Sequence, residues 1–269
     1  MGQTSGFQVQ GSAPEHYDRH VAVFMAPMVR ALVERSGLSA GGALLDVACG
    51  TGFVARAAAP VVGPEGRLAG ADVNPAMLEH ARAVCAGVVP PISFHHAPAE
   101  SMPFGEAEFD AVLCQQGLQF FPDVDAATAE AARVLRPGGR YAATVWTALD
   151  DSPYFVAQCQ AVRALAGDDD ADAFASAFSF PPDRLTGALT NAGLRDVEVE
   201  TIAPVVELPP LEDFVPGHFG AIPWGGTIAE QPDGLATATR MIAEALGDRV
   251  RADGSVAVPF GVLVVSGTR

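Results

Sequence analysis

The sequence predicts an α/β protein built on a doubly wound, mostly parallel sheet of seven strands. From residue 43 onward, short apolar runs alternate with helix-like segments, a pattern typical of repeated βαβ units. A glycine-rich turn follows the first apolar run, at the edge where such sheets bind ligands. Hydrophobic residues make up 49% of the chain and charged residues 18%, so a packed core is expected.

A helical layer is expected before the sheet, over residues 1–40. The run Ser12-Ala13-Pro14-Glu15 matches a capping box with proline in the first turn, so a helix should begin there. Apolar residues then recur at helical spacing until Gly37, and Pro27 is expected to divide the helix into two pieces. We expect this layer to act as a lid over a core of residues 41–147.

The core contains five predicted strands, at residues 43–48, 67–73, 92–94, 109–114 and 140–145. Asn74 before Pro75 is typical of a helix start, and Asp123 or Asp125 should begin a second helix over 126–135. The run Arg136-Pro137-Gly138-Gly139 predicts a turn before the fifth strand.

The second half of the chain is less regular, and two insertions are expected after strands five and six. The first covers 148–194, is helical over 152–192, and carries Phe174, Phe178 and Phe180, which ordinary core packing would also explain. Within 195–269, strands are predicted at 196–207 and 256–266, and they flank a second insertion rich in Pro and Gly at about 209–254. Together these segments predict one domain over 1–269.

The charge of the chain argues against several classes of partner. The formal net charge is −16, from 32 acidic and 16 basic residues, so the surface repels phosphate backbones and anionic lipid. We therefore expect neither a nucleic-acid nor a membrane partner. All the basic residues are arginines, and the absence of lysine excludes a Schiff-base lysine, a phosphate-loop lysine and the Tyr-x-x-x-Lys pair of short-chain dehydrogenases.

The four cysteines, Cys49, Cys85, Cys114 and Cys159, are widely spaced and form no Cys-x-x-Cys motif. This spacing favours neither a metal site nor a disulfide framework, and it fits a reducing compartment. Residues 1–11 lack the apolar segment of a signal peptide, and no apolar run reaches the length of a membrane span. The sequence therefore predicts a soluble cytoplasmic protein, and it leaves open whether the chain forms a homodimer.

The strongest motif is residues 44–55, an apolar strand that enters a glycine-rich turn and then a helix. Gly50 and Gly52 permit close approach of the backbone to a ligand. The same letters fit Gly-x-Gly-x-x-Ala, which is typical of dinucleotide binding, but Asp46 would repel a pyrophosphate and attract an ammonium group. Asp72 ends the second strand and suits two ribose hydroxyls, although either acid could instead be a helix cap.

On these motifs, residues 40–147 resemble the class I S-adenosylmethionine-dependent methyltransferases. Within them, the chain is most similar to the ubiquinone and menaquinone C-methyltransferases and to many natural-product enzymes. The matching segments are 45–52, Asp72, the adenine-side loop 97–104, the fourth strand 109–114 and the run 133–139. The resemblance implies a Rossmann-like methyltransferase fold with S-adenosylmethionine as the methyl donor. The implied donor-binding residues are Tyr17, Asp46, Ala48, Cys49, Gly50, Gly52, Asp72, Val73, Met77, Pro98, Ala99, Glu100, Cys114 and Gln115.

Two departures from the family pattern affect the expected function. Pro98 stands where an aspartate commonly contacts adenine, so backbone groups of Ala99 would serve instead. The fourth strand ends in Cys114-Gln115-Gln116-Gly117, which resembles neither the Asn/Asp-Pro-Pro-aromatic motif nor the Pro-Cys nucleophile of nucleic-acid methyltransferases. We therefore expect methyl transfer to an oxygen or carbon nucleophile of a small, largely apolar or aromatic molecule, by in-line displacement in a closed pocket.

Methyl transfer needs a base only for a reluctant nucleophile, because the sulfonium donor is already activated. Candidate catalytic residues are Tyr17, which resembles a tyrosine that closes over the donor, and His20, Gln116 and His218, with His16 and Gln119 as further candidates. Each single histidine would more ordinarily be a surface or core residue. Two alternatives stay open: a donor-binding cyclase, scaffold or regulator that transfers no methyl group, and an NAD-dependent oxidoreductase.

The acceptor pocket is expected over the carboxyl ends of strands four and five, where Gln115, Gln116 and Gln119 leave the sheet. The expected walls are the N-terminal helix, residues 174–180 and the segment 214–224. In that segment, Phe219 and Trp224 are expected to face the acceptor.

Overall fold

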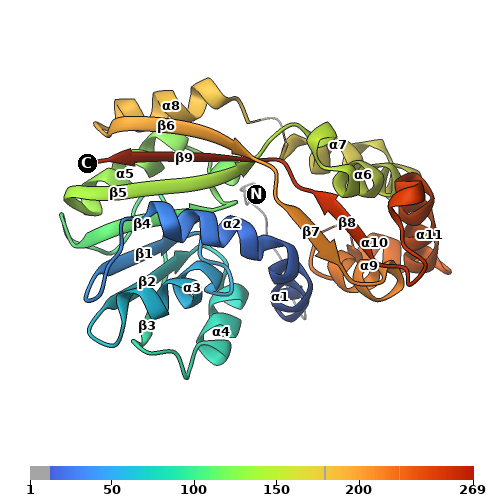
Figure 1. Cartoon of the computed structure of the whole chain (residues 1–269), viewed down its shortest axis with the longest axis horizontal. Helices are drawn as coiled ribbons and strands as arrows, with labels where there is room; N and C mark the ends of the chain where they lie inside the picture. Colours follow the sequence, from blue (N-terminus) through green and yellow to red (C-terminus); the bar gives the residue numbers. More distant parts are fainter. Residues whose placement is uncertain (1–12, 179, 224) are drawn as a thin grey trace, which may run out of the picture.

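The structure is a computed structural model that describes residues 13–178, 180–223 and 225–269. A seven-stranded sheet with helices on both faces forms one lobe, and helices with a two-stranded sheet form a second lobe beside it (Figure 1). The strands of the main sheet are β1 (Ala43–Val47), β2 (Arg67–Asp72), β3 (Ile92–His96), β4 (Phe109–Gln115), β5 (Leu135–Trp146), β6 (Arg195–Ile202) and β9 (Val262–Thr268).

The predicted doubly wound, mostly parallel sheet is confirmed. The strand order is β3-β2-β1-β4-β5-β9-β6, and β9 runs antiparallel to both of its neighbours. Helices α2 (Ala22–Arg35) and α3 (Phe53–Val62) pack on one face, and α5 (Val124–Val134) and α8 (Pro182–Asn191) on the other. Alternate residues of β1 accordingly face opposite helix layers, Leu44 on one side and Leu45 on the other.

Helix starts at the strand ends follow the predicted caps. Asn74 caps α4 (Pro75–Val84) by accepting hydrogen bonds from the backbone N–H groups of Ala76 and Met77. Asp123 caps α5 in the same way through the N–H of Ala126. Residues 136–139 differ from the prediction, because they bulge within β5 instead of preceding it, between the Phe109–Leu135 and Ala111–Arg140 pairs.

The N-terminal helix also departs from its prediction. Ser12 lies outside the described residues, and α1 covers Ala13–His16. A π-helical turn over Tyr17–Val21 follows, and α2 then runs unbroken through Pro27. Pro27 does not divide the helix, because Met28 and Leu32 beyond it are fully buried and tertiary packing outweighs the lost hydrogen bond.

The predicted strands 196–207 and 256–266 are each broken into two. Pro204 follows β6 and Gly261 precedes β9, so the ladder with the main sheet stops there. The remaining parts, β7 (Val205–Leu208) and β8 (Val256–Pro259), pair with each other in the second lobe.

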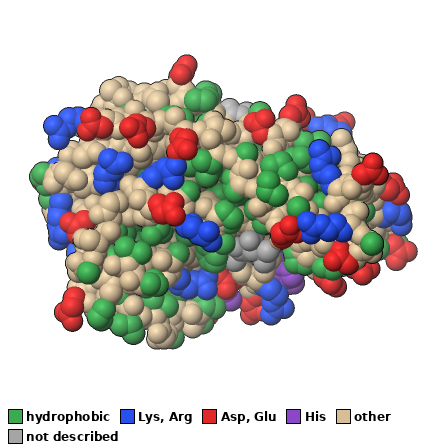
Figure 2. Space-filling view, viewed as in Figure 1, with side chains coloured by type: hydrophobic (Ala, Val, Ile, Leu, Met, Phe, Trp, Pro, Cys, Tyr) green, Lys and Arg blue, Asp and Glu red, His purple; other side chains and the backbone are tan. Residues whose placement is uncertain are grey.

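The second lobe joins segments from both predicted insertions. Its helices are α6 (Pro153–Ala166), α7 (Asp168–Ser176), α9 (Leu211–Phe219), α10 (Gly225–Ala229) and α11 (Gly234–Leu246), with α6 packed against α7 and α11 (Figure 1). Helix α8, expected within the first insertion, instead covers the main sheet through Leu185, Ala188 and Leu189. Acidic and arginine side chains are scattered over both lobes on the face shown in Figure 2. Among the described helices, none is long and apolar enough to cross a bilayer.

Candidate functional site

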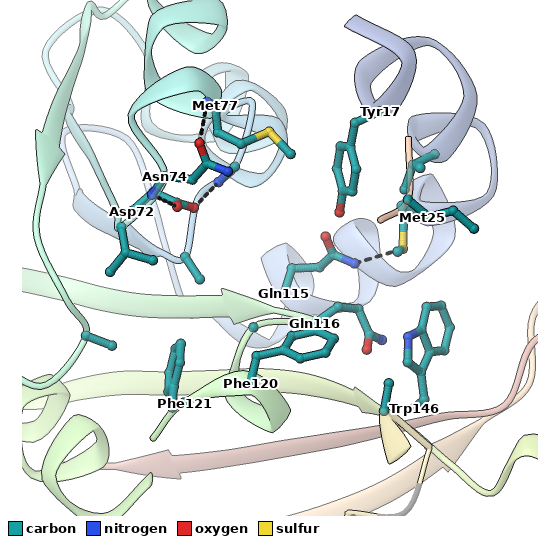
Figure 3. Close-up of a pocket in the computed structure, with 18 of the residues that line it drawn as sticks. Tyr17, Met25, Asp72, Asn74, Met77, Gln115, Gln116, Phe120, Phe121 and Trp146 are labelled. Atoms are coloured by element: carbon teal, nitrogen blue, oxygen red, sulfur yellow. Dashed lines mark hydrogen bonds between the residues drawn. The ribbon is translucent and has the colours of Figure 1, made fainter. Parts of the chain in front are cut away.

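A cavity of about 510 Å³ lies at the carboxyl ends of β1, β2, β4 and β5, and the second lobe closes its other side. Its residues fall into two groups, with Tyr17, Met25 and Gln115 at the boundary between them (Figure 3). The glycine-loop half comprises Ala48, Gly50, Asp72, Val73, Asn74, Met77 and residues 97–100. The aromatic half comprises Val21, Phe24, Gln116, Trp146, Phe155, Gln158, Ala173, Phe174, Ala177, Phe178, His218 and Ile222, while Gly117, Phe120, Phe121 and Pro122 follow β4 along the cavity.

The turn after β1 brings backbone to the cavity surface. Ala48, Gly50 and Gly52 all have positive φ, at 55°, 51° and 78°. A Cβ atom on Gly50 would meet nothing within 4 Å, so it would project into open space beside the cavity. A Cβ atom on Gly52 would instead lie 3.0 Å from the Phe94 ring. Gly50 therefore leaves room for a ligand, and Gly52 allows tight packing within the protein.

Asp72 places a carboxylate in the glycine-loop half. Its two oxygens accept hydrogen bonds from the backbone N–H groups of Gly50 and Asn74, each at 2.8 Å (Figure 3). Burial raises the pKa of Asp72, and these backbone hydrogen bonds partly oppose that rise. A carboxylate oxygen can accept more than one hydrogen bond, so the side chain keeps capacity to accept from ligand hydroxyls.

Asp46 does not line the cavity, contrary to the direct ligand contact expected from the sequence. Its carboxylate is buried and accepts a hydrogen bond from the N–H of Ala55, in the first turn of α3, at 3.2 Å. Burial raises the pKa of Asp46 to about 8. The structure therefore favours the alternative of a capping role, in which Asp46 accepts from a first-turn N–H of α3, although the N-cap position itself is Gly52.

The other predicted donor-binding residues also divide into those that line the cavity and those that do not. Cys49, Gly52 and Cys114 are absent from the described lining, and the two cysteines are buried in the protein. Burial raises the pKa of Cys114 to about 12, so its thiol stays protonated. The cavity is lined by the remaining members of the predicted set, namely Tyr17, Ala48, Gly50, Asp72, Val73, Met77, Pro98, Ala99, Glu100 and Gln115.

Tyr17 reaches the cavity from the π-helical turn. It packs with Met77 of α4, and Figure 3 shows its hydroxyl directed toward the Gln115 amide. Burial and the nearby Asp72 carboxylate raise the pKa of Tyr17 to about 12, so the phenol stays protonated. Its neighbour Asp18 accepts a hydrogen bond from the Thr51 hydroxyl at 3.0 Å and pairs with Arg56. These contacts tie the N-terminal segment directly to the glycine-rich turn.

The structure separates the two predicted catalytic histidines. His20 is not among the described lining residues; its ring lies against Gly217 and stacks on His16 with centroids 5.8 Å apart. His218 lines the aromatic half, and its Nδ1 lies 2.8 Å from the Tyr154 hydroxyl. Burial, helped by the positive charge of His20, lowers the pKa of His218 to about 3. His218 is therefore a neutral hydrogen-bonding group and a weak proton acceptor.

The walls of the aromatic half come partly from the predicted segments. Phe174, Phe178 and Ile222 line the cavity. Phe219 is not among the described lining residues, and its ring is fully buried in the hydrophobic core. Trp224 lies outside the described residues. Phe180 packs against the core on the other face of the sheet.

Several lining residues were not expected from the sequence. Trp146 is the last residue of β5, so its place at the carboxyl end of a strand was a usable signal. Phe155 and Gln158 lie on α6, and only the packing of the second lobe brings them to the cavity. Within the described part of the chain, no group of three or more His, Cys, Asp or Glu side chains is placed to hold a metal ion.

The part of the chain that carries the glycine-rich turn matches a known protein family. Residues 45–143 match the family described as "Methyltransferase domain". The ubiquinone/menaquinone biosynthesis C-methyltransferase of Hahella chejuensis is 41% identical over 113 residues, which are 41% of this chain and 45% of that protein. The chain therefore matches less than half the length of this relative.

Two solved structures share the fold over nearly the whole chain. The phosphoethanolamine N-methyltransferase 2 of Haemonchus contortus, in complex with S-adenosyl-L-methionine, gives a TM-score of 0.59 at 17% identity and covers 97% of this chain and 60% of that one. The [4+2]-cyclase SpnF gives a TM-score of 0.54 at 17% identity and covers 100% of this chain and 87% of that one. At this identity the likeness concerns the fold alone.

Proposed function

Since the chain contains a class I methyltransferase domain, we propose that it transfers a methyl group from S-adenosylmethionine to an oxygen or carbon atom of a small, largely apolar or aromatic molecule. One observation carries this proposal. A single cavity joins the turn of Gly50 and the Asp72 carboxylate to an aromatic space. Donor and acceptor would then lie in one enclosure, as direct transfer between them requires.

The glycine-loop half suits the donor. The open space beside Gly50 accommodates a ligand against backbone, and the Asp72 carboxylate suits the two hydroxyls of a ribose. Ala97, Pro98 and Ala99 offer an apolar surface for adenine on the same side of the cavity. When bound, S-adenosylmethionine supplies a methyl group on a sulfonium sulfur, and its transfer leaves S-adenosylhomocysteine and releases a proton from an O–H or C–H acceptor.

The chain's own contribution is mainly positioning and exclusion of water. Tyr17 and Gln115 lie at the boundary between the two halves, where the reacting atoms would meet (Figure 3). Asp18 holds Tyr17 in place through Thr51 and Arg56. His218 is neutral and holds a proton poorly, which favours acceptors whose own O–H or C–H is acidic.

Calorimetry and product analysis test the proposal. S-adenosylmethionine and S-adenosylhomocysteine should bind the whole chain, whereas NAD should not. Incubation with methyl-labelled donor and a panel of phenols, enols and hydroxylated ring ketones should then give a labelled product, detected by mass spectrometry. Absence of donor binding would refute the proposal. Donor binding without any methylated product across the panel would instead support the non-methylating alternative.

A further inference from the structure

Gln158 is a buried polar residue whose amide has no partner in the described structure. It lies on α6, is 0% exposed and lines the aromatic half of the cavity. Neither its Oε1 nor its Nε2 has a hydrogen-bond partner in the described parts of the chain. Buried amides are nearly always hydrogen-bonded, because an unsatisfied amide loses its hydration without compensation. A leucine or methionine would fill the same space without this loss, so the amide indicates a ligand.

A second amide extends into the same half. Gln116 is 7% exposed and has a left-handed backbone, with φ of 53°. Its Oε1 accepts a hydrogen bond from the Nε2 of Gln119 at 3.1 Å, and its own Nε2 has no partner among the described residues. Figure 3 shows the Gln116 side chain running toward Trp146. A strained backbone at such a residue is common where a side chain must be aimed at a ligand.

The surroundings of these amides are aromatic and uncharged. Trp146 and Phe155 lie with ring centroids 4.9 Å apart, and Phe178 stacks on Trp146 at 6.0 Å. Among the described lining residues, the charged side chains are Asp72 and Glu100, and both belong to the glycine-loop half. An ionised group in the aromatic half would be buried without a counter-charge, which is strongly unfavourable.

We propose that Gln158 determines acceptor specificity by binding an uncharged, flat ring system that carries a hydrogen-bond donor beside an acceptor, such as a lactam or a ring hydroxyl next to a carbonyl. The Gln158 amide itself presents a donor beside an acceptor, and such a group matches it in both positions. The Gln116 Nε2 would donate to a second oxygen of the same molecule. This inference rests on the proposed function, since it names the class of acceptor for that site.

Binding experiments on the whole chain, with S-adenosylhomocysteine present, test this specificity without requiring turnover. Three probes are used: the planar lactam 2-quinolone, the hydrocarbon naphthalene, which has a similar shape, and the anion 2-naphthoate. Quenching of tryptophan fluorescence gives the affinities, because Trp146 lines the half in question. We expect 2-quinolone to bind the wild-type protein at least about tenfold more tightly than naphthalene, and 2-naphthoate to bind least.

Gln158→Leu should reduce this preference for the lactam to below about threefold while naphthalene binds as well as before. Its melting temperature should be unchanged or higher, because no hydrogen bond within the protein is lost. Gln160→Leu is the matched control, since Gln160 lies exposed on the same helix and should keep the full preference.

Equal binding of lactam and hydrocarbon by the wild-type protein, absence of lactam binding, or an unaltered preference in Gln158→Leu would overturn this assignment. A melting temperature that falls in Gln158→Leu would show that the amide has a structural partner, and would also overturn it. Binding of S-adenosylhomocysteine is measured separately by calorimetry. Its absence would refute the proposed function itself, so the two failures are distinguishable.

Discussion

Replacement of Asp72 by alanine tests the donor site most directly. The Asp72 carboxylate faces the cavity and is held by the N–H groups of Gly50 and Asn74, so its remaining lone pairs have fixed directions. Hydrogen bonds to a charged group contribute about 1.5–3 kcal/mol each. Burial raises the pKa of Asp72, so the charged form is partly disfavoured before any ligand binds, and each of the two hydrogen bonds to a ribose should contribute about 1–1.5 kcal/mol, between the values for neutral and charged groups.

We therefore expect Asp72→Ala to weaken binding of S-adenosylmethionine by about 2–3 kcal/mol, or about 30- to 150-fold. The stability of the fold should change less than the donor affinity. Gly50 and Asn74 lose an acceptor, but a buried charge is removed as well, and we expect the free energy of unfolding to change by no more than about 1 kcal/mol. Isothermal titration calorimetry measures the first quantity and urea unfolding the second.

Asp123→Ala provides the matched control. Asp123 caps α5 through the N–H of Ala126 at 3.0 Å, is exposed, and is not among the described lining residues. Its loss should lower the free energy of unfolding by about 1 kcal/mol and leave the donor dissociation constant unchanged. If Asp72→Ala binds the donor within twofold of the wild-type protein, or if Asp123→Ala weakens binding as much, the ribose assignment is wrong.

Three further predictions concern other parts of the molecule. Gly50→Ala places a Cβ atom in the cavity and should weaken donor binding at least about tenfold by calorimetry. The control Gly41→Ala, where φ is also positive and space is open, should share only the backbone strain of about 1–2 kcal/mol, so equal donor binding by both variants would place the donor elsewhere. The pKa of Asp46 is raised to about 8, so the folded state holds a proton that the unfolded state loses near pH 4. The free energy of unfolding should therefore fall as pH rises from about 4 to about 8, by up to about 1.4 kcal/mol per pH unit. Urea unfolding at pH 5, 6.5 and 8 checks this, and Asp46→Asn should remove that part of the slope; an identical slope in the variant would contradict it. Phe219→Ala should lower the free energy of unfolding by about 3–5 kcal/mol because the ring is fully buried. Ile222→Ala, at the cavity wall, should alter acceptor affinity with a smaller change in stability, and the reverse pattern would contradict the placement of both residues.

The main sheet could be predicted from the sequence because its signals are local. Strand-like runs, Asn74 and Asp123 before helices, and the glycine-rich turn each act within a few residues of where they stand. The two broken strands were missed because Pro204 and Gly261 act on pairing between segments that lie far apart in the chain. Propensity does not reveal which of two sheets a strand will join.

The two acids at the strand ends illustrate what the sequence could not predict within the site. Asp46 and Asp72 look equivalent in the sequence, yet one is directed to the start of α3 and the other to the cavity. The direction of each depends on the path of the turn that follows, where Ala48 and Gly50 adopt left-handed conformations. Gln158 could not be found at all, because its place depends on how α6 packs against α11 and the main lobe.

The construction of the aromatic half has a consequence for how the specificity of the proposed activity can diverge. Most of its wall comes from the N-terminal segment, α6, α7 and α9, none of which supplies a strand to the main sheet. Apart from Asp18, which contacts Thr51 and Arg56, residues in these segments can therefore change without disturbing the hydrogen-bonded ladder or the turn at Gly50. A lineage that keeps residues 43–147 nearly fixed can acquire new acceptors by exchanging side chains at a few wall positions, and directed evolution of this chain should begin with the same positions.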